Sequence, residues 1–278
     1  MARQAQGIRV GIGGWKYPPW RGRFYPEGLP QREELAFASR QVSAIEVNST
    51  YYGTQKPATF AQWREETPDD FVFSLKAPRH ATQRRVLAEA AGSIERFIAS
   101  GIAELGPKLG PLVWQFPPTH AFEPGDFEAF LDLLPESVEG LPLRHVLDVR
   151  HDSFRIPEFL ALARRHRCAT VFTDSPNFPS FADLTRDDLV YARLMCSQPD
   201  VPTGYCAEAL ERLVDAARTW AQGGEPEGPP RIAPPAAAGG AAPPRDVFLY
   251  FIDGAKENAP AAATALLARW RSSSPAPA

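Results

Sequence analysis

Cysteine, long apolar runs and net charge are all scarce in this chain of 278 residues. Its three cysteines, Cys168, Cys196 and Cys206, lie far apart and form no C-x-x-C pair, which excludes a disulfide framework and a paired-cysteine metal or redox site. A cytoplasmic location is therefore expected. No apolar run approaches the ~20 residues that cross a bilayer. Met1 to Gln6 also lacks the apolar stretch of a signal peptide, so no membrane association is expected.

The balance of charges argues against a protein that binds nucleic acid over its whole surface. Thirty basic and thirty-three acidic side chains leave a net charge of -3. No global basic field then attracts a phosphate backbone, and nucleic-acid binding would have to be local. A nucleic-acid partner stays possible but is not supported by the net charge.

Proline is the abundant residue, with 29 in the chain, and its distribution suggests the domain limits. Many prolines lie where an element would begin or end, because proline fixes φ and lacks an N–H. The stretch from Gly223 to Arg245 has one branched apolar side chain, Ile232. It cannot offset its ordering entropy by burial. We predict one domain over 7–271 with a disordered Pro/Gly/Ala-rich insertion at 223–245, and a flexible tail at 272–278.

Eight short apolar runs alternate with segments of helical period. The runs are Ile8–Ile12, Ala44–Val47, Phe71–Leu75, Leu112–Phe116, His145–Val149, Ala169–Phe172, Leu189–Leu194 and Val247–Ile252. Helices are expected at Gln31–Arg40, Ala58–Glu66 and Glu158–Arg167 and around residues 94–105, 127–134, 210–217 and 266–270. Eight strands in α/β alternation predict a TIM-type (β/α)₈ barrel, since an open doubly wound sheet usually stops at five or six strands. The crossover from Ser175 to Asp188 has room for only a short helix or turn.

Several blocks of aromatic and polar residues occur in a fixed order along the chain. They include Gly13-Gly14-Trp15-Lys16-Tyr17, Ile45-Glu46-Val47-Asn48-Ser49-Thr50-Tyr51-Tyr52, Phe71-Val72-Phe73-Ser74-Leu75-Lys76-Ala77-Pro78-Arg79, Trp114-Gln115-Phe116-Pro117-Pro118, Arg150-His151, Asp174-Ser175, Tyr191-Ala192-Arg193-Leu194 and Tyr250-Phe251. These blocks closely resemble the YecE-like family, known as domain of unknown function 72. The resemblance implies a TIM-type barrel and names no activity.

The chain departs from that family pattern in three places. Asp148 stands where a Glu is usual, Met195-Cys196 replace a His-Gly, and Ile252-Asp253-Gly254 replace an Asp-Asn-Asp block. If those family residues serve catalysis, this chain belongs to a branch with altered or lost chemistry.

A barrel builds its site at the carboxyl ends of the strands, so the polar residues that close each apolar run are the candidates. As catalytic residues we expect Glu46, Asp148, Asp174 and His151. As substrate-binding residues we expect Gly14, Trp15, Asn48, Lys76, Arg79, Gln115, Arg150, Arg193, Tyr250 and Lys256. Gly13 and Gly14 would allow a tight turn or the close approach of a ligand to backbone N–H groups. Trp15 could stack on a ligand or pack in the core.

Two interpretations of these charges remain open. Glu46, Asp148 and Arg193 lie inside apolar runs, where a charge must be paired or must line a polar cavity. They either form a structural ion-pair network or a catalytic site, and in the second case Glu46→Gln and Asp148→Asn should fold nearly normally. Five cations among the candidates against three carboxylates favour an anionic ligand.

The expected function is an enzyme that uses acid/base chemistry on a phosphate-containing or other small anionic substrate, such as a phosphoester or a nucleic-acid-derived compound. A glycoside hydrolase with two of Glu46, Asp148 and Asp174 as its carboxylates is one alternative. A barrel that binds or scaffolds without catalysis is the other. No cofactor is predicted, although the same three carboxylates could form an oxygen-only divalent metal site. The sequence does not specify the oligomeric state.

Overall fold

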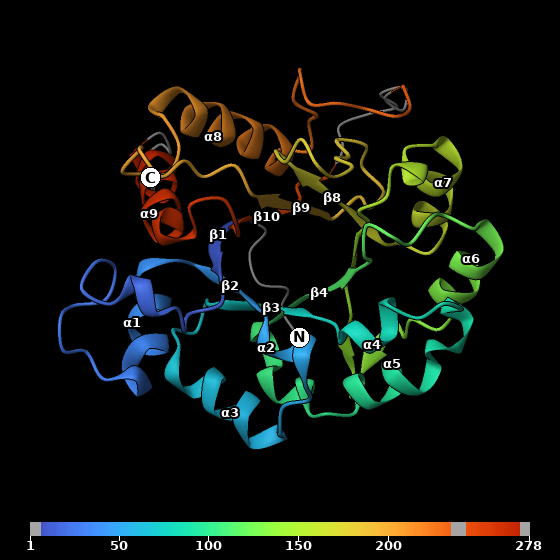
Figure 1. Ribbon diagram of the computed structural model, residues 1–278, viewed down its shortest axis with the longest axis horizontal. Coiled ribbons are helices and arrows are strands. Elements are labelled where there is room, and N and C mark those ends of the chain that lie inside the picture. The colour runs from blue at the N-terminus through green and yellow to red at the C-terminus, as the bar shows by residue number, and fades with distance from the viewer. Residues whose placement is uncertain (1–6, 235–242, 273–278) are drawn as a thin grey trace.

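The apolar runs form eight parallel strands that close into a barrel in the order β1-β10-β9-β8-β7-β4-β3-β2 in the computed structural model (Figure 1). The structure describes residues 7–234 and 243–272. The barrel strands are β1 (Ile8–Gly13), β2 (Ala44–Val47), β3 (Val72–Lys76), β4 (Leu109–Gln115), β7 (His145–Asp148), β8 (Ala169–Thr173), β9 (Leu189–Leu194) and β10 (Asp246–Phe251). Each corresponds to one expected run, so the prediction of a TIM-type barrel in one domain is confirmed.

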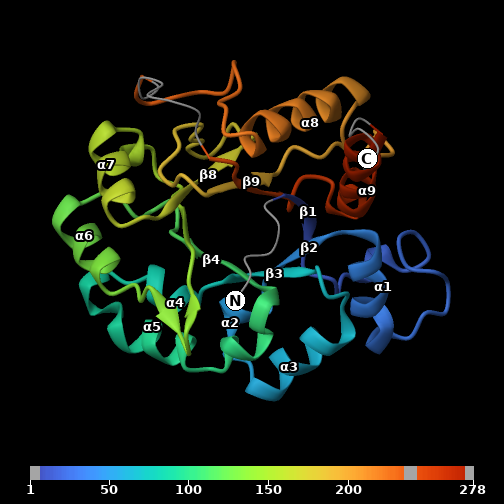
Figure 2. The ribbon, with the colours of Figure 1, turned by 180° about the vertical axis from the view of Figure 1, so that it is seen from behind.

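Helices surround the barrel on its outside (Figures 1 and 2). They are α1 (Glu34–Gln41), α2 (Ser49–Tyr52), α3 (Pro57–Glu66), α4 (Arg79–Thr82), α5 (Ala91–Ile98), α6 (Pro124–Asp132), α7 (Pro157–Arg165), α8 (Ala207–Ala221) and α9 (Ala259–Ser272). Pro57, Pro124 and Pro157 open their helices, where a missing N–H costs nothing. The short helices α2 and α4 and the hairpin of β5 (Ser137–Val138) and β6 (Leu141–Pro142) were not anticipated. No helix in the described part of the chain is long and apolar enough to cross a membrane.

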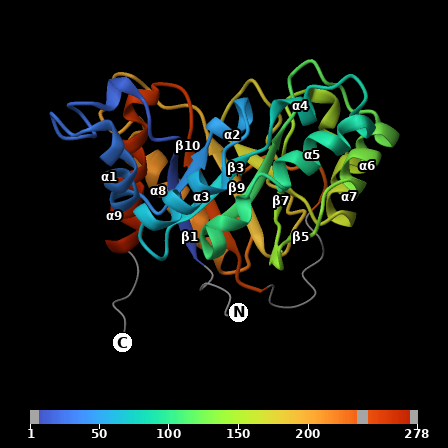
Figure 3. The same cartoon turned by 90° about the horizontal axis from the view of Figure 1, so that it is seen from below.

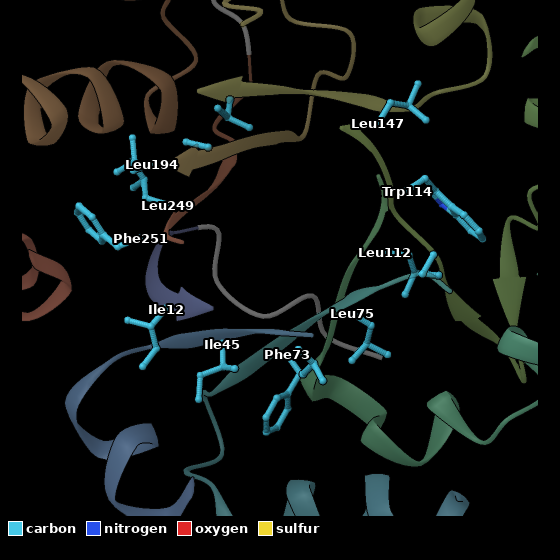
Figure 4. Packing of buried hydrophobic residues seen from close by; sticks show 14 of the residues in the cluster. Ile12, Ile45, Phe73, Leu75, Leu112, Trp114, Leu147, Leu194, Leu249 and Phe251 are labelled. Carbon is cyan, nitrogen blue, oxygen red and sulfur yellow. The ribbon is translucent and has the colours of Figure 1, made fainter. Parts of the chain in front are cut away.

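Alternation along each strand sends one set of side chains outward and the other into the barrel. Outward side chains, among them Trp114 and Phe73, pack under the helices (Figure 4). Between ring centroids, Trp114 lies 5.5 Å from Phe130 of α6 and Phe73 lies 6.0 Å from Trp63 of α3. The inward set includes Ala44, Val113, Tyr191, Phe248 and Tyr250. Because Glu46, Lys76, Asp148 and Arg193 follow inward residues at intervals of two, they also face the barrel interior.

The carboxyl ends of the strands lie at one end of the barrel. The short helices α2 and α4, which directly follow β2 and β3, lie at this end, and the β5–β6 hairpin lies at the other (Figure 3). The polar residues that close the strands therefore share the first end, which we call the barrel mouth.

The crossover from β8 to β9 contains no helix among its described residues, where its length and prolines left room for only a short helix or turn. Part of the Pro/Gly/Ala-rich segment packs against it instead. The Asp183 carboxylate, which is 3% exposed, accepts hydrogen bonds from the backbone N–H groups of Ile232 and Ala233 at 2.8 and 3.0 Å. Ala182 N–H donates to Pro230 C=O at 3.1 Å. Around residues 230–233 the segment is thus attached to the barrel, which the expectation of a disordered 223–245 insertion did not include. Residues 235–242, and the tail 273–278, lie outside the described residues.

We expect Asp183→Ala to lower the free energy of unfolding by roughly 2–3 kcal/mol, because two backbone donors lose their charged acceptor. Asp187→Ala is the matched control, since Asp187 is exposed on the same loop. Chemical denaturation measures both. Equal stabilities for the two variants would contradict the attachment.

Candidate active site

The guanidinium of Arg193 lies at the centre of the barrel mouth between two carboxylates. Its Nε and Nη2 donate to Glu46 Oε2 and Oε1 at 3.1 and 3.0 Å, a two-pronged pair. Its Nη1 donates to Asp148 Oδ2. Arg193, Glu46 and Asp148 are 1%, 0% and 3% exposed. Three strands, β9, β2 and β7, therefore supply one buried ion network.

Neighbouring polar groups fill the remaining hydrogen-bonding positions of this network. Tyr191 Oη donates to Glu46 Oε2 at 2.9 Å, so both Glu46 oxygens are occupied. Gln115 Oε1 accepts from Arg193 Nη1 at 3.3 Å and from Arg150 Nη2 at 3.1 Å. Arg150 also donates to Asp148 Oδ2 from Nε and Nη2, each at 3.3 Å. Two guanidinium groups thus converge on one oxygen of Asp148.

These contacts set the protonation states in the network. Burial alone would lower the pKa of Arg193, but Glu46 and Asp148 raise it above its ordinary value, and the guanidinium stays charged. Burial and then the Glu46 charge raise the pKa of Tyr191, which stays a neutral donor. Beneath it, Tyr250 shares a hydrogen bond of 2.7 Å with Ser74, and burial raises the pKa of its phenol too. Glu46 therefore faces a charged guanidinium and a neutral phenol that both donate to it.

Lys76 is the exception among these charged groups. Its side chain is buried, and its Nζ lies 4.3 Å from the ring centroid of Tyr51. Nζ makes no hydrogen bond or ion pair with any residue that the structure describes. Burial, and then the Arg193 charge, lower the pKa of Lys76 to about 8, although Glu46 and Asp148 act in the opposite direction. Oδ1 of Asp148 likewise has no hydrogen-bond partner within the described ranges.

Two of the predicted catalytic residues lie outside this network. Asp174 accepts from Tyr205 Oη at 2.7 Å and from the Met195 N–H at 2.6 Å, so both oxygens anchor the loop after β9. His151 Nδ1 accepts from the Ser153 N–H at 3.2 Å and caps the turn at 152–154. Each has a local structural partner. The sequence correctly placed them near strand ends but could not show these partners.

The predicted binding residues divide between four environments. Arg193 is the centre of the network, Lys76, Gln115 and Arg150 lie beside it, Tyr250 lies below it, and Arg79 is exposed beside Tyr52. Gly14, Trp15, Asn48 and Lys256 line a cleft of about 620 Å³ that extends from the ends of β1 and β2 toward α3.

The cleft and the network meet at the backbone of Gly14 and Glu46. Gly14, at φ 76°, donates its N–H to the Glu46 C=O at 2.9 Å. Trp15 is 7% exposed, its ring packs edge-on against Trp63 at 5.1 Å, and its carbonyl accepts from Tyr25 Oη. Of the two roles left open for Trp15, its contacts are those of a core residue that forms the cleft floor.

The comparisons with known proteins agree on one family. The model of a protein family described as "Protein of unknown function DUF72" matches residues 9–278. The chain belongs to the DUF72 family. It is 32% identical to the UPF0759 protein YecE of Escherichia coli K12 over 142 residues, which are 50% of this chain and 48% of that protein. The match thus spans about half the length of this curated relative.

Solved structures show the same fold. A DUF72 family protein from Thermotoga maritima MSB8 has a TM-score of 0.67 at 20% identity, covering 95% of this chain and 98% of that one. A DUF72 family protein from Enterococcus faecalis V583 has a TM-score of 0.64 at 15% identity, covering 96% and 94%. SacUVDE has a TM-score of 0.55 at 10% identity, covering 95% and 99%. At these identities the likeness concerns the fold alone.

The departures from the family pattern have local roles in this DUF72 protein. Cys196 donates its N–H to Tyr205 Oη at 3.0 Å, so Met195 and Cys196 belong to the loop that Asp174 anchors. Gly254 has φ 82°, and a Cβ there would lie 2.5 Å from the Ser197 carbonyl oxygen. Only glycine fits that crossing.

A metal site is not assembled from the predicted carboxylates. In residues 7–234 and 243–272, no three His, Cys, Asp or Glu side chains gather where they could hold an ion. Glu46 and Asp148 bind Arg193, and Asp174 binds the β9 loop. The alternative of an oxygen-only site at these three residues therefore gains no support.

Sequence reasoning missed three side chains of the site, Ser74, Tyr191 and Tyr51. Ser74 and Tyr191 each lie two residues before a selected cation on the same strand, so the inward alternation could have identified them. Tyr51 lies on α2, which had no helical period to reveal it.

The burial of Glu46 changes the expectation for its amide variant. We expect Glu46→Gln to lower the free energy of unfolding by ~3–5 kcal/mol, because Arg193 would keep its buried charge without its two-pronged partner. Glu65→Gln, at an exposed position, is the control. Chemical denaturation measures the free energy of unfolding of both variants. Near-wild-type stability of Glu46→Gln would contradict the structural role.

Lys76→Met should stabilise the protein at neutral pH, and the gain should shrink as pH rises. The unfolded chain binds a proton at Lys76 more tightly than the folded one, so wild-type stability rises between the folded and unfolded pKa values. The difference between wild type and variant should change by about 2 kcal/mol from pH 7 to pH 9.5. Denaturation at both pH values, with Lys56→Met as an exposed control, measures it. A difference that does not vary with pH would show that the amine is not destabilised by burial.

Proposed function

We propose that the barrel mouth is the active site of an enzyme that binds a small anionic substrate and transfers protons through Lys76 and Asp148. One observation carries the proposal: the charges at the mouth do not balance. Among the described residues, Arg193, Arg150 and protonated Lys76 face Glu46 and Asp148 alone, which leaves one positive charge. A buried surplus charge is costly without a counter-ion, so an anion is the fitting ligand.

The free groups are suited to proton transfer. Glu46 cannot act as an acid or base without breaking two bonds to Arg193 and one to Tyr191. Lys76 Nζ and Asp148 Oδ1, which bond to no described residue, are open to a substrate. An amine with a pKa of about 8 is close enough to neutral pH to give and take a proton. Glu46 and Arg193 are positioning residues in this scheme.

Arg150 supplies the anion contact. Its side chain is 16% exposed, the guanidinium is oriented by Asp148 and Gln115, and its other face is covered by the Phe178 ring, 4.4 Å from Cζ to centroid. A guanidinium fixed in this way suits phosphate or carboxylate oxygens.

The glycoside hydrolase alternative fits less well. That chemistry needs two carboxylates that flank an open space for a glycosidic bond or a water. Here Arg193 bonds to both Glu46 and Asp148 and occupies the position between them. Nothing in this arrangement favours a neutral sugar over an anion.

Inorganic phosphate should raise the free energy of unfolding, by about 2.7 kcal/mol at a hundredfold excess over its dissociation constant. Arg150→Gln should weaken phosphate binding about tenfold, since a charge-assisted contact is lost. Arg165→Gln, which removes a surface pair with Glu128, should leave phosphate binding unchanged. Calorimetry with phosphate, a nucleotide and short single-stranded DNA at two salt concentrations tests the preference. No response to any of the three would favour a barrel that does not bind anions.

A further inference from the structure

Lys76 differs from the other deeply buried lysine of the described chain, Lys108. The Lys108 amine donates to the carbonyls of Arg64 and Thr67 at 2.6 and 2.7 Å, so it is committed to a structural role. Residue Lys76 is 7% exposed. Its amine lies over the Tyr51 ring and donates to no described acceptor. Tyr51 is itself fixed by a hydrogen bond from Gln83 Nε2 at 2.9 Å. Lys76 is thus held in place, but its amine makes no hydrogen bond to the described residues.

Burial favours the neutral form of Lys76, and the charged groups around it act in both directions. Burial is the largest influence, followed by Arg193, and Arg150 acts in the same direction. Glu46 and Asp148 act against them, but each is already paired with arginine. With a pKa of about 8, roughly a tenth of the amine is neutral at pH 7. A neutral amine has a free lone pair, which makes it a nucleophile.

We propose that Lys76 forms a covalent imine with a carbonyl substrate whose phosphate or carboxylate group is held by Arg150. The proposal rests on the anionic-substrate site above and names its substrate class, an anionic aldehyde or ketone. Lys76 and Arg150 both face Asp148 at the mouth, so the reacting carbon and the anionic group of one small molecule have separate partners.

The chemical step balances without a further reactant. The Nζ lone pair attacks the carbonyl carbon, a C–N bond forms, and the carbonyl π electrons move to oxygen, which takes a proton. The nitrogen loses a proton, and the hydroxyl leaves as water once it is protonated. Overall, the lysine ammonium and the carbonyl give an iminium and water, with one positive charge on each side. In this step Asp148 Oδ1, free of described partners, carries the proton between nitrogen and oxygen.

The small number of lysines makes this testable. The chain has five, Lys16, Lys56, Lys76, Lys108 and Lys256. Lys16 and Lys56 are exposed, and Lys108 is bonded. Lys256 also lies over a tyrosine ring, Tyr17 at 4.9 Å, but it lines the cleft. Burial lowers its pKa, while Asp253 and Glu46 act in the opposite direction. It serves as an internal comparison.

The full chain would be treated with substoichiometric pyridoxal 5′-phosphate, an aldehyde that carries a phosphate, then reduced with borohydride and mapped by peptide mass spectrometry. We expect the label mainly on Lys76. Labelling there should rise about tenfold from pH 7 to pH 9, as the neutral fraction of the amine rises. Excess inorganic phosphate, or Arg150→Gln, should reduce it about tenfold. Pyridoxal, which lacks the phosphate, should label Lys76 correspondingly less.

Matched variants separate the possible outcomes. Lys76→Arg should abolish the main label, and Lys56→Arg should keep it. Thermal melting checks that both variants fold. If Lys76→Arg does not fold, the map of labelled lysines in the wild type is sufficient. Label on Lys16, Lys56 or Lys256 with Lys76 unmodified would overturn the imine proposal, while stabilisation by phosphate would leave the anion site standing. Equal labelling of Lys76 by pyridoxal and by its phosphate would instead support the nucleophile and contradict the role of Arg150.

Discussion

The guanidinium of Arg193 is the constraint on which the barrel mouth depends. It bonds to Glu46 on β2 and Asp148 on β7, strands on opposite sides of β9 in the closed ring. A buried arginine with two carboxylates has to keep all its partners, since losing one leaves an unpaired charge in a medium of low dielectric constant. The network thereby fixes the relative positions of the strand ends. The free groups, Lys76 Nζ and Asp148 Oδ1, lie on these strands and are therefore held in fixed positions.

The same constraint explains why these polar groups divide into two kinds. Glu46 and Tyr191 have every relevant hydrogen-bonding position filled by Arg193 or by one another, and they act as supports. Arg150 and Lys76 are the second kind, since the Arg150 guanidinium is partly exposed and the buried Lys76 amine lacks an acceptor among the described residues. A reactive group surrounded by fully bonded supporting residues is the arrangement expected when a catalytic group is held by rigid neighbours.

Local patterns were sufficient for the fold and for the inward cations, and insufficient for their partners. Eight apolar runs predicted eight strands because an apolar run of strand length is visible in neighbouring residues alone. That Glu46 pairs with Arg193, 147 residues away, depends on barrel closure, which no local pattern records. Asp174 and His151 were selected by position alone, and their hydrogen bonds to Tyr205, Met195 and Ser153 come from loops whose paths a sequence does not show. Ile232 looked too isolated to pack, yet it is partly buried against the core and its backbone N–H donates to Asp183.

The missing helix between β8 and β9 has a consequence for how this sector accepts mutations. Elsewhere a helix satisfies its own backbone, so many side chains serve equally well. Here single side chains do that work: Ser180 binds the N–H and C=O of Thr173, and Thr185 binds the Thr170 N–H and the Cys168 C=O. Each such contact requires a particular residue type. The sector that carries Phe178 over Arg150 is therefore intolerant of substitution, one position at a time, even though it lacks regular secondary structure.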